Sequence, residues 1–239
     1  MGRVFIGTSG WVYPHWRGRF YPENIPDGGW LEFYAKNFSA VELNASFYHL
    51  PGEKTFRSWY ERTPKDFVFA IKGSRFITHV KRLRDCQEPL ANLLQSVSGL
   101  EEKLGPIFFQ LPPSFESDKE RLGDFIRLLP IGKRFAFEFR HPSWFNKEVC
   151  ALLQKANCAL VASDTPDYPY GEIQTANFMY FRLHGHEQLY ASSYTRMQLK
   201  EYAERMRQYL RRGDVFVFFD NDANANAVEN AKGLAKLVE

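Results

Sequence analysis

Short stretches in which apolar and polar residues alternate recur along the chain. The clearest runs from Phe135 to Arg140, where three phenylalanines alternate with Ala136, Glu138 and Arg140. A period of two is typical of a β-strand, so this stretch predicts a strand with an aromatic face and an opposite face that becomes charged. Pro142 then ends the strand, because proline cannot donate to a sheet. Similar stretches predict strands at residues 3–10, 40–46, 67–73, 107–113, 159–164, 178–184 and 215–220.

Amphipathic segments separate most of these strands. We predict helices at residues 30–38, 54–63, 88–103, 145–156, 195–212 and 224–238, and a further helix that a capping box at residues 117–120 opens. Gly105 and Pro106 are expected to close the helix that precedes the strand at 107–113. Residues 165–176 contain Pro166, Pro169 and Gly171, so they are too short and too broken to form a full helix.

Strand and helix therefore alternate about eight times, without a linker or a low-complexity stretch. This order predicts a single (β/α)8 TIM-like barrel, irregular between strands six and seven, with residues 1–239 as one domain. At 239 residues and 44% hydrophobic, the chain has the length and composition of one such barrel. A doubly wound open sheet is the alternative.

Polar residues end all but one of the predicted strands. In a barrel, inward-facing residues at the carboxyl ends of the strands gather around one axis, where barrel enzymes keep their active sites. A single pair of opposite charges such as Glu138 with Arg140 is typical of a structural ion pair. A change from apolar to polar residues at the same end of most strands instead favours a ligand site. The predicted mouth residues are Glu42, Asn44, Lys72, Gln110, Glu138, Arg140, Asp164, Arg182, His184 and Asp220.

Overall charge and cysteine usage narrow the picture only slightly. The formal net charge of +3 fits a general attraction to anions, but it is small for a dedicated nucleic-acid binder. Cys86, Cys150 and Cys158 form no CxxC pair and are odd in number, so we expect reduced thiols. With no signal-peptide pattern and no apolar run long enough for a membrane span, we expect a soluble, cytoplasmic protein.

Two loops carry residues that suit recognition of a flat or anionic ligand. Residues 11–22 combine Trp11, Tyr13 and Trp16 with several cations, which suits stacking on a base or a sugar ring. The same aromatics would equally suit a loop that folds over and closes the end of the barrel. Residues 75–84 are basic, and such a run is usually a solvated face.

Several blocks of sequence match the motifs of a known family. These blocks are residues 7–11 (GTSGW) with 20–22 (FYP), 41–44 (VELN) with 47–48 (FY), 77–79 (ITH), 109–113 (FQLPP), 138–144 (EFRHPSW), 182–185 (RLHG) and 221–222 (ND). Through them the chain resembles the YecE-like family of uncharacterised barrel proteins over essentially its whole length. The resemblance implies a TIM-like barrel and assigns no catalytic residue. The chain departs from the pattern at Asp220, where the family more often has asparagine, and it lacks the glycine expected shortly afterwards.

The mouth residues favour an enzyme that acts on a phosphorylated or otherwise anionic, ring-containing substrate. Lys72, Arg140 and Arg182 would hold the anion. Glu138 and Glu42 would exchange protons, with His184 or His141 assisting. Hydrolysis of a phosphoester or glycosidic bond is the first expectation, and a sugar-type isomerisation is the second. The further ligand-binding candidates are Asn44, Gln110, Trp11, Asp164 and Asp220.

Two other possibilities stay open from the sequence. One is a metal site made of Glu138, Asp164, His184 and Asp220, since carboxylates and imidazole are ordinary metal ligands. The other is a non-catalytic barrel that binds nucleic acid or a nucleotide through the loops at 11–22 and 75–84. The cofactor, the identity of the substrate and the oligomeric state do not follow from the sequence.

Overall fold

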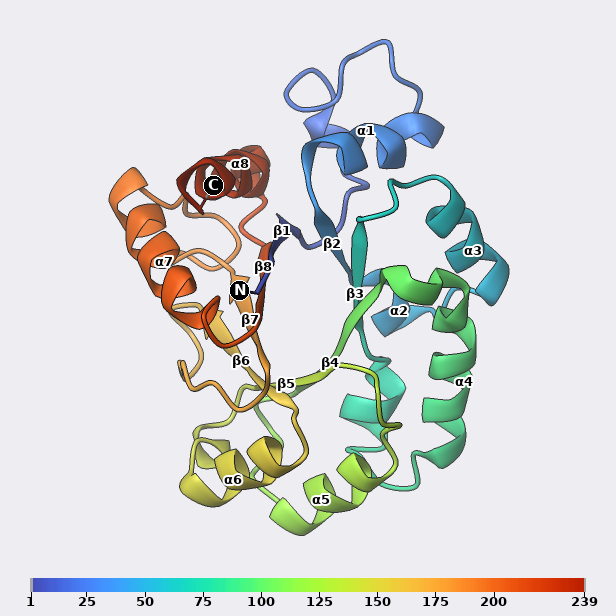
Figure 1. Ribbon diagram of the computed structural model, residues 1–239, viewed down its shortest axis with the longest axis vertical. Helices are drawn as coiled ribbons and strands as arrows, with labels where there is room; N and C mark the ends of the chain where they lie inside the picture. The colour runs from blue at the N-terminus through green and yellow to red at the C-terminus, as the bar shows by residue number, and fades with distance from the viewer. Residues whose placement is uncertain (1, 239) are drawn as a thin grey trace.

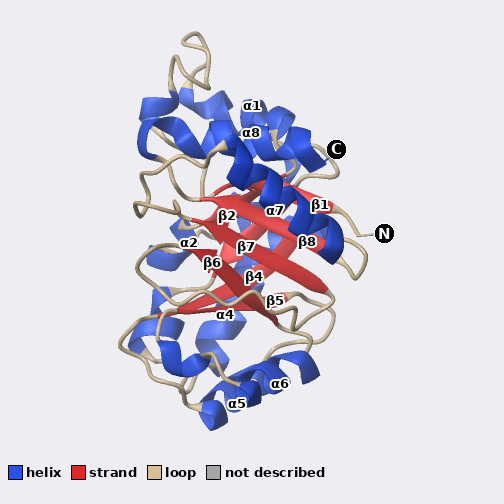
Figure 2. Cartoon of the chain, turned by 90° about the vertical axis from the view of Figure 1, so that its left-hand side faces the viewer, coloured by secondary structure: helices blue, strands red, loops and turns tan. Residues whose placement is uncertain are grey.

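Eight parallel strands form a ring that the helices surround, in a computed structural model that describes residues 2–238 (Figure 1). Seen from the side, the strands cross obliquely between the helices (Figure 2). Neighbouring strands pair in the order β1-β8-β7-β6-β5-β4-β3-β2, and a backbone bridge between Ser9 and Glu42 joins the two ends. The predicted TIM-like barrel is therefore confirmed. The strands are β1 (Val4–Thr8), β2 (Ala40–Leu43), β3 (Val68–Lys72), β4 (Leu104–Leu111), β5 (Phe135–Phe139), β6 (Ala159–Asp164), β7 (Phe178–Leu183) and β8 (Asp214–Phe219).

Helices follow most strands, as the amphipathic segments predict. They are α1 (Trp30–Asn37), α2 (Ala45–Tyr48), α3 (Glu53–Glu61), α4 (Gln87–Val97), α5 (Lys119–Arg127), α6 (Lys147–Lys155), α7 (Arg196–Tyr209) and α8 (Asn226–Val238). The chain runs from β6 to β7 without a helix, in agreement with the proline-rich sequence there. None of the helices within residues 2–238 combines the length and the apolar character that crossing a bilayer requires. The three cysteines are free thiols, as expected.

Two hydrophobic cores lie on opposite faces of the strands. The larger fills the space between strands and helices, and the smaller fills the barrel interior. Inside the barrel, β1, β4, β7 and β8 contribute aromatic rings, whereas β2, β3 and β5 contribute alanines. Phe5 stacks on Phe216 with ring centroids 4.8 Å apart, and Tyr180 lies 5.4 Å from both Phe108 and Phe218. Large rings from one set of strands and small side chains from the others thus fill the interior together.

The junction between β1 and β2 depends on a glycine and a buried tyrosine. A Cβ at Gly7 would lie 1.9 Å from the carbonyl oxygen of Ala40, so only glycine allows the two strands to approach this closely. The hydroxyl of Tyr34, on α1, donates to the same Ala40 oxygen at 3.2 Å and accepts from the amide of Thr8 at 2.8 Å. A helix side chain therefore replaces part of the missing strand ladder.

Two local predictions were wrong. Gly105 and Pro106 lie inside β4 and do not close a helix. The preceding helix ends at Val97, and a 3-10 segment at Ser98–Lys103 connects it to the strand. The cap of α5 is Asp118 and not Ser117: the Asp118 side chain accepts the amide of Arg121 at 3.0 Å. A carboxylate at this position satisfies a free amide and also suits the helix dipole.

Candidate functional site

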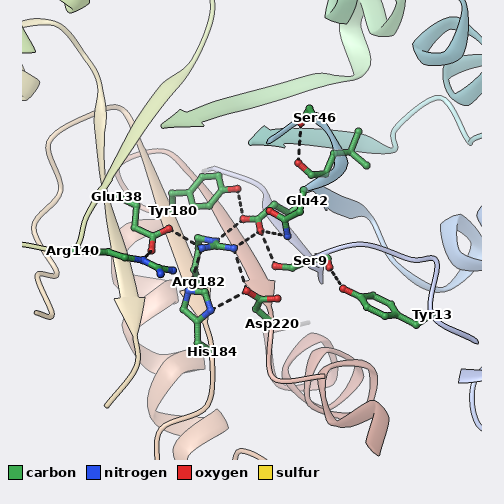
Figure 3. Close-up of polar contacts among 12 residues, drawn as sticks. Ser9, Tyr13, Glu42, Ser46, Glu138, Arg140, Tyr180, Arg182, His184 and Asp220 are labelled. Atoms are coloured by element: carbon green, nitrogen blue, oxygen red, sulfur yellow. Dashed lines mark hydrogen bonds and ion pairs between the residues drawn. The ribbon is translucent and has the colours of Figure 1, made fainter. Parts of the chain in front are cut away.

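Four charged side chains meet at the carboxyl ends of the strands, three of them buried and the fourth, Asp220, partly exposed (Figure 3). Arg182, on β7, lies at their centre with 1% of its side chain exposed. It contacts Glu42 on β2, Glu138 on β5 and Asp220 just after β8. We call these four residues the mouth cluster. Polar residues that the alternation assigned to separate strands thus form one ion network.

Glu42 accepts hydrogen bonds from several groups at once. Arg182 binds both of its carboxylate oxygens, with Nε at 2.9 Å from Oε2 and Nη2 at 2.8 Å from Oε1. The hydroxyl of Tyr180 donates to Oε2 at 2.8 Å, and that of Ser9 donates to Oε1 at 2.7 Å. A buried carboxylate of this kind is retained only when it is well paired, and here these four side-chain atoms and a longer contact from the Asn44 amide satisfy it.

Glu138 bridges two guanidinium groups. Its Oε2 accepts from Nη1 of Arg182 at 2.7 Å, and its Oε1 accepts from Nε of Arg140 at 3.1 Å. Burial is the largest influence on its pKa and opposes the charge, but the positive charges of Arg182 and Arg140 together hold the pKa well below its ordinary value. At neutral pH Glu138 therefore has no proton to donate.

Asp220 and His184 complete the cluster on the side of β8. Nη2 of Arg182 lies 3.3 Å from Asp220 Oδ2, and Nη1 donates to Nε2 of His184 at 3.2 Å. Because a guanidinium can only donate, Nε2 of His184 must accept. Nδ1 of His184 then faces Asp220 Oδ2 at 2.9 Å, in a close contact that lacks good hydrogen-bond geometry. Burial opposes ionisation of Asp220, yet His184 and Arg182 keep its pKa below the ordinary value.

Lys72 differs from the other mouth cations because no carboxylate of residues 2–238 forms an ion pair with it. Its side chain is partly exposed at the end of β3, and Nζ lies 4.4 Å from the centre of the Phe47 ring. Burial, followed by the positive charge of Arg182, lowers the pKa of Lys72 to about 8. About a tenth of this amine is therefore uncharged at pH 7.

The assignment of Asp164 to the mouth was wrong. In the register of β6 with β7, Ser163 lies opposite Arg182, so Ser163 and not Asp164 faces the axis. Asp164 points to the helices instead, where it accepts the hydroxyl of Tyr202 at 2.8 Å and contacts Nδ1 of His186 at 3.1 Å. The sequence of β6 is apolar on both faces up to this point, so the polar residue by itself did not show which face is inward.

Three other predicted ligand-binding residues lie in different surroundings. Gln110 faces the axis, is 5% exposed and lies opposite Glu138 in the register of β4 with β5. Asn44 follows β2, outside the strand, and its amide lies 3.4 Å from Oε1 of Glu42. Trp11 is 7% exposed in the outer core, edge-to-face with Trp59, so its ring has no free face for stacking on a ligand.

The alternation did not identify every residue that contacts the mouth cluster. Tyr180 and Ser9 hold Glu42, and Tyr180 shares the parity of Arg182, so that parity was the signal that could have found it. A pocket of about 500 Å³ also opens beside Asp220, lined by His15, Arg19 and Asp222 among others. These residues come from loops after β1 and β8, where no periodic pattern exists.

The predicted four-residue metal set does not form, because Asp164 lies on the opposite face of β6 from the mouth cluster. Within residues 2–238, no group of three or more His, Cys, Asp or Glu side chains is arranged to hold a metal ion. Glu138, His184 and Asp220 instead share Arg182 as a common partner. In this arrangement the guanidinium supplies the positive charge among the carboxylates.

Comparisons with known proteins agree on one family. The family described as "Protein of unknown function DUF72" matches residues 5–239. The UPF0759 protein YecE of Escherichia coli is 32% identical over 145 residues, which are 60% of this chain and 51% of YecE, so the chain spans about half the length of that relative. The UPF0759 protein YunF of Bacillus subtilis is 24% identical over 99% of this chain and 95% of its own length.

Solved structures extend the likeness to the whole chain. A DUF72 family protein of Thermotoga maritima is 30% identical, with a TM-score of 0.89 over 99% of both chains. A DUF72 family protein of Enterococcus faecalis, 20% identical, has a TM-score of 0.85 over 98% of this chain and 95% of its own, which shows the shared fold alone. The barrel, its YecE-like motifs and the match to nearly every residue lead to one conclusion: the chain belongs to the DUF72 family.

Proposed function

We propose that this protein is an enzyme that acts on a small phosphorylated or otherwise anionic, ring-forming substrate and moves a proton on it, as a sugar-type isomerase does. The observation that carries the proposal is Lys72. It is a partly exposed amine at the carboxyl end of a barrel strand, and its pKa is lowered to about 8. An amine with a pKa near the working pH is well suited to general base catalysis.

The two carboxylates support isomerisation over hydrolysis. Cleavage of a glycosidic bond ordinarily needs two carboxyl groups that reach the substrate, one of them protonated. Glu42 and Glu138 are 0% and 1% exposed and both bind Arg182. The pKa of Glu138 is also held well below its ordinary value, against the acid role. Hydrolysis, the first expectation from sequence, therefore has less support than the second.

The anion-binding role also falls on fewer residues than the sequence suggested. Arg182 is enclosed and fully engaged by carboxylates and His184, so it serves as the centre of the mouth cluster. Arg140 donates through Nε to Glu138 and stacks on Tyr168, with its guanidinium carbon 4.4 Å from the ring centre. It is 11% exposed, so of the two predicted anion-binding arginines it is the one that a ligand can still reach.

Binding of nucleic acid has weaker support. Trp11 and Trp16, which were to stack on bases, are 7% and 0% exposed and belong to the outer core. The aromatic rings of the loop at residues 11–22 are thus used mainly in packing within the protein's own outer core. The basic residues at 75–84 alone are an ordinary solvated face.

Hydrogen exchange on carbon tests the proposal. The protein is incubated in heavy water with a panel of phosphorylated aldoses and ketoses, and loss of the carbon-bound proton beside the carbonyl is followed by proton NMR. We expect the wild type to catalyse exchange and Lys72→Met to exchange the carbon-bound proton at least 100-fold more slowly. Lys155→Met, which removes an exposed lysine on α6, should exchange at the wild-type rate. Exchange by Lys72→Met at the wild-type rate would overturn the role of Lys72, and a wild type inert on the whole panel would overturn the isomerase.

A further inference from the structure

The pocket beside Asp220 contains a histidine that a carboxylate orients. Nε2 of His15 is hydrogen-bonded to the backbone oxygen of Asp222 at 3.2 Å and lies 2.8 Å from Oδ2 of the same residue at ion-pair distance. Both neighbours are oxygen acceptors, so Nε2 carries a proton, and Nδ1 is the nitrogen left for a ligand. The His15 side chain is 46% exposed and lines the pocket. An imidazole held at one nitrogen by a carboxylate, with the other available, is the arrangement of a general acid or base.

Asp222 itself is held firmly. Its Oδ1 accepts the indole Nε1 of Trp16 at 2.8 Å, and Trp16 is completely buried. Burial, the largest influence, raises the pKa of Asp222 to about 6. The carboxylate is therefore ionised at neutral pH and can orient His15. A surface pair between two flexible side chains would lack this buried anchor.

The walls of the pocket are pinned in one conformation. The backbone amide of Ala223 donates to the oxygen of Tyr190 at 3.1 Å, and the side chain of Asn226 donates to the oxygen of Ala191 at 2.9 Å, so the loops after β7 and β8 are joined. Tyr190 and Asn224, which line the pocket, have φ angles of +62° and +60°, a left-handed region that favours glycine. Such conformations concentrate at functional sites because the surroundings must enforce them.

The pocket is also next to the charges that the proposed function uses. Asp220 lines the pocket and, on its inner side, contacts Nη2 of Arg182 (Figure 3). Its negative charge is felt by the amine of Lys72. Arg19 is an exposed cation on the pocket wall, so an anionic group has a partner there. The pocket thus combines a cation, an oriented imidazole and access to the mouth cluster.

We propose that His15, oriented by Asp222, is a second acid–base residue of the enzyme and that Arg19 binds the anionic group of the substrate in this pocket. The inference rests on the proposed isomerisation of an α-hydroxy carbonyl compound. Lys72 does not line the pocket, so the step requires that the bound substrate extends past Asp220 to the Lys72 amine. Lys72 takes the proton from the carbon beside the carbonyl, the C–H electron pair forms the C=C bond of an enediol, and the carbonyl oxygen takes the proton from Nδ1 of the imidazolium form of His15. The neighbouring hydroxyl then returns its proton to His15, and the Lys72 ammonium returns its proton to the adjacent carbon, so no proton is consumed.

Kinetics of the phosphorylated-sugar panel separate this inference from the proposed function. We expect His15→Gln to lower kcat for isomerisation at least 100-fold, Arg19→Gln to raise KM about 10-fold with little change in kcat, and His49→Gln, a change at another exposed histidine, to leave both unchanged. If Lys72→Met is inactive but His15→Gln equals the wild type, the role of His15 is overturned and the proposed function stands. If Lys72→Met equals the wild type, the proposed function is overturned.

Binding of inorganic phosphate gives a readout without turnover. The ring resonances of His15 are followed by NMR during a phosphate titration of the whole protein. We expect saturable shifts in the wild type that Arg19→Gln abolishes and that Arg211→Gln, a change at an exposed arginine outside the pocket, preserves. Unchanged His15 resonances in the presence of saturating phosphate, or equal shifts in Arg19→Gln, would overturn the pocket as the anion site.

Discussion

Arg182 binds Glu42 through two hydrogen bonds across the barrel mouth, with Nε and Nη2 at 2.9 and 2.8 Å from the two carboxylate oxygens. The fork-to-fork geometry fixes both side chains, and the pair is 1% and 0% exposed. Since Glu42 also accepts from Ser9 at the β1–β2 junction, the pair links the centre of the barrel to its closing edge. Removal of one partner of such a pair leaves an uncompensated buried charge, which is more costly than the pair itself is stabilising.

Glu138→Gln should destabilise the protein. The substitution removes the charge that Arg182 and Arg140 share, and leaves buried guanidinium groups short of a partner. We expect a loss of about 3 kcal/mol. In a chain of this length 1 kcal/mol corresponds to about 2 to 4 °C, so the melting temperature should fall by roughly 6 to 12 °C. Calorimetry against Glu201→Gln, at an exposed position, provides the control. A neutral or stabilising effect would instead mark Glu138 as a ligand-facing carboxylate.

Lys72→Met should stabilise the protein at neutral pH. The folded state lowers the pKa of Lys72 from 10.5 to about 8, so below pH 8 folding carries the cost of a partly buried charge. Because Lys72 is partly exposed, solvent screens part of this effect. We therefore expect the free energy of unfolding of Lys72→Met to exceed that of the wild type by about 1 to 2 kcal/mol.

The same variant has a defined pH dependence. Between pH 8 and 10.5 the unfolded chain holds more protons at Lys72 than the folded chain, so wild-type stability rises with pH relative to Lys72→Met. The stability difference between the two proteins should be largest below pH 8 and disappear by about pH 10.5. Urea unfolding at several pH values measures this difference, and a difference independent of pH would exclude the lowered pKa.

Asp164→Asn should weaken the fold without affecting binding at the mouth. Asp164 accepts a hydrogen bond from the hydroxyl of Tyr202 on the helix side of β6, the face opposite to the mouth cluster. Loss of a buried, charge-assisted hydrogen bond should cost about 1.5 to 3 kcal/mol. Thermal unfolding and phosphate titration of the variant test the two halves of the statement. A selective loss of phosphate binding at unchanged stability would return Asp164 to the ligand site.

Gly7→Ala should disrupt the closure of the barrel. The added Cβ would lie 1.9 Å from the backbone oxygen of Ala40, so β1 and β2 must separate. We expect a loss of about 4 kcal/mol or more, since the obstacle is backbone and cannot rotate away. Gly28→Ala is the matched control, because a Cβ there meets no atom within 4 Å. Equal stability of the two variants, compared by urea unfolding, would mean that the junction can open at little cost.

The sequence by itself determined the order of strands and helices and the inward direction of most polar residues. Where one parity is large and apolar and the other ends in charge, as in Phe135–Phe139, the side-chain period settles which face is which. In β6 both faces begin with apolar residues, so only the register with β7 decided that Ser163 is inward and Asp164 is outward. The local pattern determines that the residues alternate, but the register with the partner strand determines which of them face the barrel axis.

Only the tertiary structure decided which charges meet and how each group titrates. Arg182 and Glu42 are 140 positions apart, and His15 and Asp222 are 207 apart, so no local pattern relates them. Lys72, Arg140 and Arg182 are equivalent cations in the sequence, yet two are held by carboxylates and the third is not. Charge interactions and desolvation depend on distances and burial that exist only after the chain has folded, and this is the physical reason that the lowered pKa of Lys72 could not be read from residue order.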